Sequence, residues 1–282
     1  MADDPPPSAT SRLGRRAAFG LISALALPAT TAHAAVDPNG APAGTLLRVL
    51  RTGVLRVGVW LDVPPWGSYG DDGSPDGAEV ALAKVLARDL GVRLRLVRLA
   101  AHNRIEALEE DRVDVLLALV PAVPATRRRV ALASAHGELV VTIAAPRGHR
   151  FRTLDDLAGK RIALPEHTYA ADAVRGRLPP DTTALFLPDT LSCADAAAHG
   201  RADAAALYSW MVRDLTVTRP DLELELAFPV SHTHHAMAVS LGEHDLLRFL
   251  NTFLYLRQAD GTIADIQERY LRSVSPPLPA YR

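Results

Sequence analysis

Short β-rich runs alternate with helical segments along most of this chain, and this alternation restricts its fold more than any other feature. Residues 55–60 and 92–99 have strand patterns, and apolar residues recur at helical spacing from 78 to 90, where Gly91 ends the pattern. The nearly continuous apolar run 113–120 predicts a central strand that is buried on both faces. Repeated strand–helix–strand units predict parallel strands joined by right-handed crossovers, and therefore an α/β protein.

A second set of the same kind follows without a break in composition. Strands are expected at 139–145, 161–164, 184–187 and 202–207, and helices at 169–177 and 193–199. The chain then returns through a strand at 236–240 and ends in helices at 245–258 and 262–270. Two successive α/β sets predict two lobes in one chain. Ligands of α/β proteins bind beyond the carboxyl ends of strands, so a cleft between the lobes is the expected site.

Composition excludes several other classes of function. The chain has 282 residues and a formal net charge of −1, and it contains no basic stripe, so nucleic acid and anionic lipid are not expected partners. Its hydrophobic content of 48% suits a soluble globular protein. The single cysteine, Cys193, rules out an internal disulfide in a monomer, and its alanine neighbours predict a core position rather than a reactive thiol.

Residues 1–34 have the pattern of an export signal. Arginines precede an apolar run at 17–28, which is too short to span a bilayer as a helix. Ala32-His33-Ala34 supplies a small-x-small cleavage pattern, so the mature chain should begin at Ala35 and reside in the periplasm. The Arg15-Arg16 pair resembles a twin-arginine signal, but its spacing to the following Phe is one residue too long, and the export route stays open. No later segment is long and apolar enough for a membrane span.

Several short segments together carry a resemblance that none of them carries alone. They occur at 53–59 with Pro64-Pro65-Trp66, and then at 77–91, 103–108, 113–115, 154–163, 250–251 and 260–270. In this order they resemble the family 3, amino-acid-type, periplasmic solute-binding proteins, the extracytoplasmic receptors of ABC importers. The resemblance extends from about residue 46 to residue 272.

The resemblance implies an α/β, two-lobed periplasmic-binding-protein fold of type II. Each lobe would be a mixed sheet flanked by helices, and two hinge crossovers would bend as the ligand is enclosed. Residues 1–34 would then be the signal peptide, 35–44 a linker, 45–139 plus 236–282 lobe one, and 140–235 lobe two. It further implies a small-molecule ligand, the membrane subunits of an ABC importer as partners, a monomeric state and no cofactor.

Three residues match the ligand-contacting positions of the family. Arg127 stands where the family places the arginine that grips the ligand carboxylate, and a guanidinium suits that task because it donates two parallel bonds. Thr168 stands at the start of a lobe-two helix, where it would cap the helix and face the carboxylate. Trp66 follows two prolines and would form an aromatic wall of the site. Each residue also has a purely structural alternative. Arg127 would belong to a solvated basic turn, Thr168 would only cap its helix, and Trp66 would pack as an ordinary core residue.

The chain also departs from the family at the site. Tyr208 replaces the acid that usually pairs with the ligand ammonium, and His167 replaces a glycine beside Thr168. A phenol brings no compensating charge for a buried ammonium. The ligand is therefore expected to carry a carboxylate but to differ from an ordinary α-amino acid, unless Glu79 or Glu166 supplies the missing charge. Glu79, Tyr208 and His167 complete the predicted ligand-binding set.

Other functions remain open on the sequence alone. His232, His234 and His235 could ligate a metal from one strand edge, but no metal site is predicted, because a polar loop with incidental histidines explains them and spacing fixes no cysteine or carboxylate partner. A cyclohexadienyl-dehydratase-like enzyme on the same fold would need an acid or base in the cleft, such as Glu79 or Glu166. A periplasmic accessory or sensor protein that binds no ligand is the third alternative.

Overall fold

The structure is a computed structural model that describes residues 44–271. The predictions for the export signal, its cleavage site, the export route and nearly all of the linker fall on residues outside this range. Within residues 44–271, none of the helices combines the length and the apolar character that crossing a bilayer requires.

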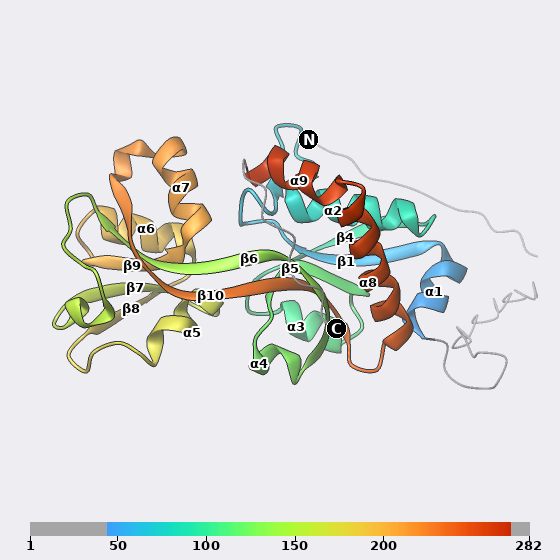
Figure 1. The fold of residues 1–282 in the computed structure, drawn as a ribbon, viewed down its shortest axis with the longest axis horizontal. Helices are drawn as coiled ribbons and strands as arrows, with labels where there is room; N and C mark the ends of the chain where they lie inside the picture. Colours follow the sequence, from blue (N-terminus) through green and yellow to red (C-terminus); the bar gives the residue numbers. More distant parts are fainter. Residues whose placement is uncertain (1–43, 272–282) are drawn as a thin grey trace, which may run out of the picture. The chain divides into compact units, whose positions relative to one another are not determined.

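One eight-stranded sheet runs through the described part of the chain (Figure 1). Its strands, in spatial order, are β4 (Arg93–Leu99), β1 (Val54–Trp60), β5 (Val115–Pro121), β10 (Leu224–Ser240), β6 (Val130–Pro146), β9 (Ala204–Tyr208), β7 (Arg161–Pro165) and β8 (Thr183–Leu187). β1 pairs in parallel with β4 and β5, and β7 pairs in parallel with β8 and β9. The parallel strands predicted in both sets are therefore confirmed.

The two parallel groups are joined by two long antiparallel strands. β6 and β10 are each 17 residues long, pair with each other along almost their whole length, and also pair with β9 and β5, respectively. Figure 1 shows both strands passing from the group around β1 to the group around β9. The sequence patterns predicted only the segments 139–145 and 236–240 of these strands. The two sets consequently share one continuous sheet.

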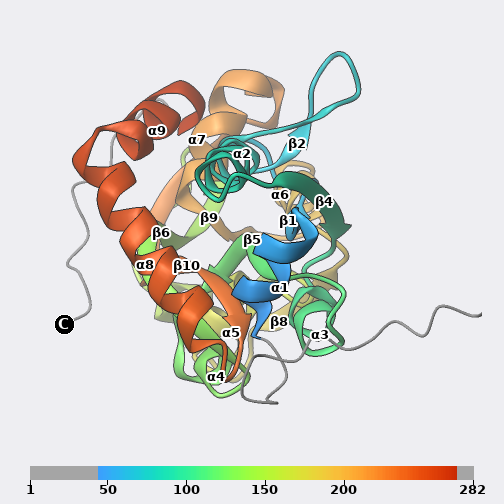
Figure 2. The same ribbon diagram turned by 90° about the vertical axis from the view of Figure 1, so that its right-hand side faces the viewer.

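Helices cover the strands of both groups. Around the first group lie α1 (Thr45–Thr52), α2 (Ala78–Asp89), α3 (Arg104–Glu109), α4 (Pro124–Arg127), α8 (His244–Ala259) and α9 (Thr262–Leu271), together with the small hairpin β2 (Ser68–Tyr69) and β3 (Pro75–Asp76). Around the second lie α5 (Tyr169–Arg175), α6 (Thr190–Ala198), α7 (Ser209–Thr218) and the 3₁₀ turns η1 (Leu154–Leu157) and η2 (Pro220–Leu222). Figure 2 shows α8 and α9 in succession along one flank, with α3 on the other.

A pair formed by one aspartate and one arginine holds the amino ends of the parallel strands together in each group. Just before β5, Asp114 accepts a hydrogen bond of 2.8 Å from the backbone N–H of Arg56 in β1. Just before β9, Asp203 accepts one of 2.8 Å from the backbone N–H of Arg161 in β7. Each carboxylate also binds the guanidinium of the same arginine. The amino ends of the parallel strands are thus held by an ion pair that is largely buried in the first group and exposed in the second, and their carboxyl ends are left for a site.

Cys193 occupies the core position that the sequence predicts. It is fully buried in α6 among alanine side chains, and burial raises the pKa of its thiol to about 12. A thiol with that pKa is protonated at neutral pH and therefore unreactive.

Candidate functional site

A cavity with about 1410 Å³ of empty space, part of which is open to solvent, lies at the carboxyl ends of β5 and β7. One side is formed by the residues around α3 and α4, among them His102, Arg104, Thr126 and Arg129. The other side is formed by the segment that follows β7 and by β8, with Glu166, His167, Tyr169, Asp172, Arg175 and Phe186. This is the position at which α/β sheets bind small molecules.

Arg104 is the buried cation of this cavity. It lies in the first turn of α3 and is 6% exposed, and its Nη1 donates to the backbone oxygens of Ala118 and Leu119 at 2.5 and 3.2 Å. The guanidinium lies 5.6 Å from the centroid of the Trp60 ring. Burial lowers the pKa of Arg104 below its usual value, although nearby Tyr208 and Glu79 favour the charged form. Among residues 44–271 no carboxylate forms an ion pair with Arg104, so an anion entering the cavity meets a desolvated guanidinium.

The other two arginines of the cavity already have partners. Arg129 forms ion pairs of 2.9 and 2.7 Å with Glu106 and Glu109, and these bonds raise its pKa. Arg175 is exposed, and its guanidinium lies 4.7 Å from the ring centroid of Phe186. Of the three cations, Arg104 is therefore the one best placed to attract a ligand anion.

The structure does not bring Arg127 to this cavity. Arg127 is the last residue of α4, and its exposed side chain lines a different hollow of about 680 Å³ with Ser134 and Asn251. Thr126 lines the large cavity instead. Consecutive residues of a helix point about 100° apart, because a turn contains 3.6 residues, so α4 directs these neighbours to different surfaces. The carboxylate-binding role of Arg127 stays a prediction.

Thr168 and His167 are neighbours with different environments. Thr168 is buried, and its Oγ1 caps α5 by accepting from the backbone N–H of Ala171 at 3.3 Å and donates to the oxygen of Pro165 at 2.9 Å. Its predicted capping role is confirmed. His167 has a positive φ of 58° and lines the cavity, where its ring lies 5.9 Å from that of His102. The structure thus places His167, but not the hydroxyl of Thr168, on the cavity wall.

Tyr208 and Trp66 belong to a buried aromatic group. Tyr208 ends β9 with 3% of its surface exposed, burial raises its pKa to about 12, and its ring stacks on Trp210 at 5.9 Å. Trp66 is 5% exposed and contacts Trp210 edge-on at 6.2 Å. Trp66 also lines a smaller hollow of about 280 Å³ beside α2 and α9. In this structure neither side chain lines the large cavity, and their ligand contacts stay predictions.

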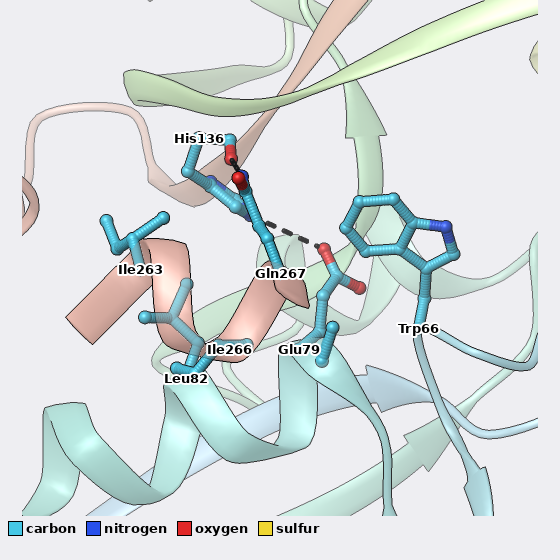
Figure 3. Close-up of a pocket in the computed structure, with 8 residues that line it drawn as sticks. Trp66, Glu79, Leu82, His136, Ile263, Ile266 and Gln267 are labelled. Atoms are coloured by element: carbon cyan, nitrogen blue, oxygen red, sulfur yellow. Dashed lines mark hydrogen bonds and ion pairs between the residues drawn. The ribbon is translucent and has the colours of Figure 1, made fainter. Parts of the chain in front are cut away.

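Glu79 is buried and lies on that smaller hollow with His136 (Figure 3), and His235 is its second histidine neighbour. Its Oε1 is 3.6 Å from His136 Nε2 and 3.3 Å from His235 Nδ1. Burial opposes the charge of Glu79, but the two histidines outweigh burial and lower its pKa to about 2. Burial, with the neighbouring His136, lowers the pKa of His235 to about 4. Glu79 is therefore a carboxylate and His235 a neutral imidazole at pH 7.

Sequence patterns did not single out Arg104, and they placed His136 near the cleft or the hinges without giving it a specific role. Arg104 begins a short helix where a charged residue normally faces water, and His136 lies in a stretch of small residues without clear periodicity. Only the pairing of α3 with β5, and of β6 with β10, buries them.

The family model of the bacterial extracellular solute-binding proteins, family 3, matches residues 55–273. The chain belongs to this family. The L-cystine-binding protein TcyJ of Escherichia coli strain K12 is 24% identical over 262 residues, which are 92% of this chain and 96% of that protein. The cyclohexadienyl dehydratase of Pseudomonas aeruginosa is 30% identical over 141 residues, about half of each protein.

Solved structures of the family share the architecture described above. The solute receptor for L-cysteine of Neisseria gonorrhoeae superposes with a TM-score of 0.74 at 26% identity, covering 82% of this chain and 95% of that one. The expected α/β, two-lobed, type II periplasmic-binding-protein fold is confirmed. The exact boundaries of the two lobes stay predictions.

Proposed function

We propose that this family 3 solute-binding protein is the extracytoplasmic receptor of an ABC importer and captures a small carboxylate-bearing, amino-acid-like molecule in the cavity beside Arg104. The single observation that carries the proposal is the buried guanidinium of Arg104 at the cavity wall. A cation held by two backbone oxygens and an aromatic ring, without a carboxylate partner among residues 44–271, has unused donors for a ligand carboxylate.

Two acidic residues on the opposite wall suit an ammonium group. Glu166 follows β7 and Asp172 lies in α5, and both line the cavity that Arg104 lines. An α-amino acid has both charges, and a cavity with Arg104 on one wall and two acids on the other can pair each of them. These acids take the place that Tyr208 cannot fill from its buried position. The ligand class therefore includes zwitterionic amino acids as well as simple carboxylic acids.

The family and its members support the rest of the proposal. The E. coli relative is named for L-cystine and the Neisseria structure for L-cysteine, and both belong to the class of binding proteins. Membership of an extracellular solute-binding family supports export to the periplasm and delivery of the ligand to the membrane subunits of an importer. The proposal also includes that the protein is a monomer.

A thermal-shift screen of the purified protein against amino acids, their decarboxylated amines and their N-acetylated forms tests the ligand class. A ligand that binds only the folded state stabilises it by RT ln(1 + [L]/Kd), so binding is seen as a saturable rise in Tm. Compounds that retain the carboxylate should raise Tm, and amines without it should not. Saturable stabilisation by the amines alone would refute the proposed site.

Arg104→Met and Arg127→Met form a matched pair for the residue assignment. Loss of a charge-assisted bond at the site weakens binding by at least about tenfold. Arg104→Met should show this loss in titration calorimetry with a ligand found in the screen, and Arg127→Met should retain the wild-type Kd. The opposite result would support the assignment made from the family resemblance.

The similarity to the Pseudomonas dehydratase supplies a second candidate function. An enzyme of this class needs an acid or base at the cavity, and Glu166 is placed there. Chromatography of each bound compound after incubation separates the two functions, because a receptor returns its ligand unchanged and a dehydratase releases a dehydrated product.

A further inference from the structure

Three side chains from distant parts of the sequence meet in the interior, away from the large cavity. Glu79 lies in the first turn of α2, His136 in β6 and His235 in β10, and their exposed fractions are 2%, 8% and 0%. Figure 3 shows Glu79 and His136 pointing toward each other across the smaller hollow. Two imidazoles and one carboxylate are a ligand set that divalent transition metals prefer.

An irregularity in the strand pairing directs both histidines to the same place. His235 pairs with Gly137 and Ala236 pairs with Ala135, so the register skips His136. A bulge of this kind re-aims a side chain that regular alternation would point to the other face. The ring centroids of His136 and His235 consequently lie only 4.5 Å apart.

Gly137 is the residue that makes room for this arrangement. A Cβ at position 137 would lie 2.1 Å from Nε2 of His235, closer than any side-chain contact permits. Glycine at this position thus allows the imidazole of His235 to lie against the backbone of β6.

The distances within the cluster are close to those of a metal site. One donor atom from each residue lies within 4.8 Å of the other two, and Glu79 Oε1 is 3.6 and 3.3 Å from the two histidine nitrogens. Two ligands bound to one Zn²⁺ ion at about 2.0–2.2 Å with tetrahedral angles lie about 3.3–3.6 Å apart. Small shifts of the three side chains therefore suffice to coordinate one ion.

The histidines have unused hydrogen-bonding capacity. All four ring nitrogens of His136 and His235 are buried, and none makes a hydrogen bond among the residues that the structure describes; His136 Nε2 and His235 Nδ1 face the carboxylate of Glu79 at 3.6 and 3.3 Å. Buried polar atoms normally have partners, so each such atom requires an explanation. A bound cation supplies one, since it would take one nitrogen from each ring as a ligand and neutralise the carboxylate of Glu79.

The smaller hollow offers a free coordination position. It has about 280 Å³ of empty space, part of which is open to solvent, and is lined by Glu79 and His136, with Trp66 and Gln267 beside them. Zinc sites with three protein ligands retain a fourth position for water. The hollow lies between α2 and α9.

A second group of similar residues lies on the same two strands. Glu138, His232 and His234 are also close enough for one ion, with Glu138 Oε2 3.4 Å from His232 Nε2. His232 is 58% exposed in its side chain, so water competes for its nitrogens. This exposed group lacks the buried, unpartnered nitrogens and serves as the matched control.

From these observations we infer that Glu79, His136 and His235 bind one divalent transition-metal ion, for which Zn²⁺ is the natural probe. The inference does not depend on the proposed function, because Arg104 and the large cavity take no part in it.

The test uses protein without a polyhistidine tag, stripped with a chelator and titrated with Zn²⁺ and Co²⁺. Wild-type protein and the His232→Ala/His234→Ala variant should each bind one equivalent and show the visible absorption of low-coordinate Co²⁺. His136→Ala and Gly137→Ala should weaken binding by at least about tenfold to a hundredfold. Circular dichroism establishes that each variant is folded.

X-ray absorption spectroscopy of the zinc-loaded wild-type protein keeps the test decisive if the buried variants do not fold. Scattering from two imidazoles in the coordination shell supports the site. Absence of stoichiometric binding by wild-type protein overturns it, and so does binding that is lost in the His232→Ala/His234→Ala variant. Normal binding by a folded His136→Ala variant overturns it equally.

Discussion

Both carboxylate oxygens of Glu79 accept from the backbone N–H of Leu119, at 3.1 and 3.0 Å. This contact ties the first turn of α2 to β5 at the point where Leu119 has a positive φ of 50°. It lies in the interior, so the N–H of Leu119 depends on Glu79 for its partner. Glu79 thus has a structural task that is separate from any ligand.

Replacement of Glu79 by alanine should lower the free energy of unfolding by about 3 kcal/mol, because it removes the acceptor and leaves buried polar groups without a partner. Glu79→Gln keeps one acceptor oxygen and should cost about 1 kcal/mol. Urea denaturation in the presence of a chelator measures both values without a contribution from bound metal. Equal losses in the two variants would show that the hydrogen bond to Leu119 is not what the carboxylate stabilises.

Replacement of Gly77 should also lower the stability of the protein strongly. Its φ is 125°, and a Cβ there would lie 2.5 Å from the backbone oxygen of Trp66. Gly77→Ala should destabilise the protein by about 2–4 kcal/mol, since both the backbone conformation and the close approach require glycine. Gly73→Ala is the control, because Gly73 also has a positive φ, 75°, but nothing lies within 4 Å of its Cβ position. A similar loss of unfolding free energy in the two variants would contradict the role of the close approach.

Much of the fold was predictable because its elements carry their own periodicity. The observed α2, Ala78–Asp89, differs by one residue from the predicted helix, and the apolar run at 113–120 became the fully buried β5. Helix α7, Ser209–Thr218, was missed because its Thr216, Val217 and Thr218 favour a strand locally. Its place against β10 and β6 is decided by tertiary packing.

The long strands β6 and β10 could not be predicted in full either, because tertiary contacts define them. Half of β6 and most of β10 consist of small, polar and histidine residues without alternation, and only their pairing with each other defines them as strands. The site residues depend on that pairing too. Neither the burial of Arg104 nor the meeting of His136 with His235 can be derived from spacing, since each depends on contacts between distant segments. The family resemblance pointed to Arg127. Its neighbour Thr126 lines the large cavity instead, because consecutive residues of a helix point in different directions.

The acidic wall of the large cavity leads to a prediction about the ligand amine. Glu166→Gln should weaken binding of an amino acid by about tenfold and leave the N-acetylated form nearly unaffected, because the acetyl group removes the ammonium charge. Asp181→Asn is a control, since Asp181 is an acid that does not line this cavity. Titration calorimetry with both compounds gives the comparison. Equal weakening for the two ligands would mean that Glu166 does not pair with the ammonium.

The last described helix is tied to the β2–β3 hairpin by one side-chain contact. The hydroxyl of Tyr270 in α9 donates to Oδ1 of Asp76 at 2.6 Å. This bond is the main reason why the pKa of Asp76 lies below its usual value. The positive charges of Lys84 and Arg269 lower it further by smaller amounts. Both side chains are half-buried, so solvent screens part of the interaction.

Tyr270→Phe should therefore cost about 1 kcal/mol of unfolding free energy at neutral pH. A carboxyl group whose pKa is lower in the folded state stabilises the protein above its unfolded pKa, about 3.9, and that contribution disappears as the pH falls through the folded value. The difference between Tyr270→Phe and wild type should consequently shrink below pH 4. Chemical denaturation at pH 7 and pH 3 measures it, with Tyr255→Phe as the control because Tyr255 is 70% exposed. A difference that stays constant across this range would show that the hydroxyl acts through packing rather than through the charge of Asp76.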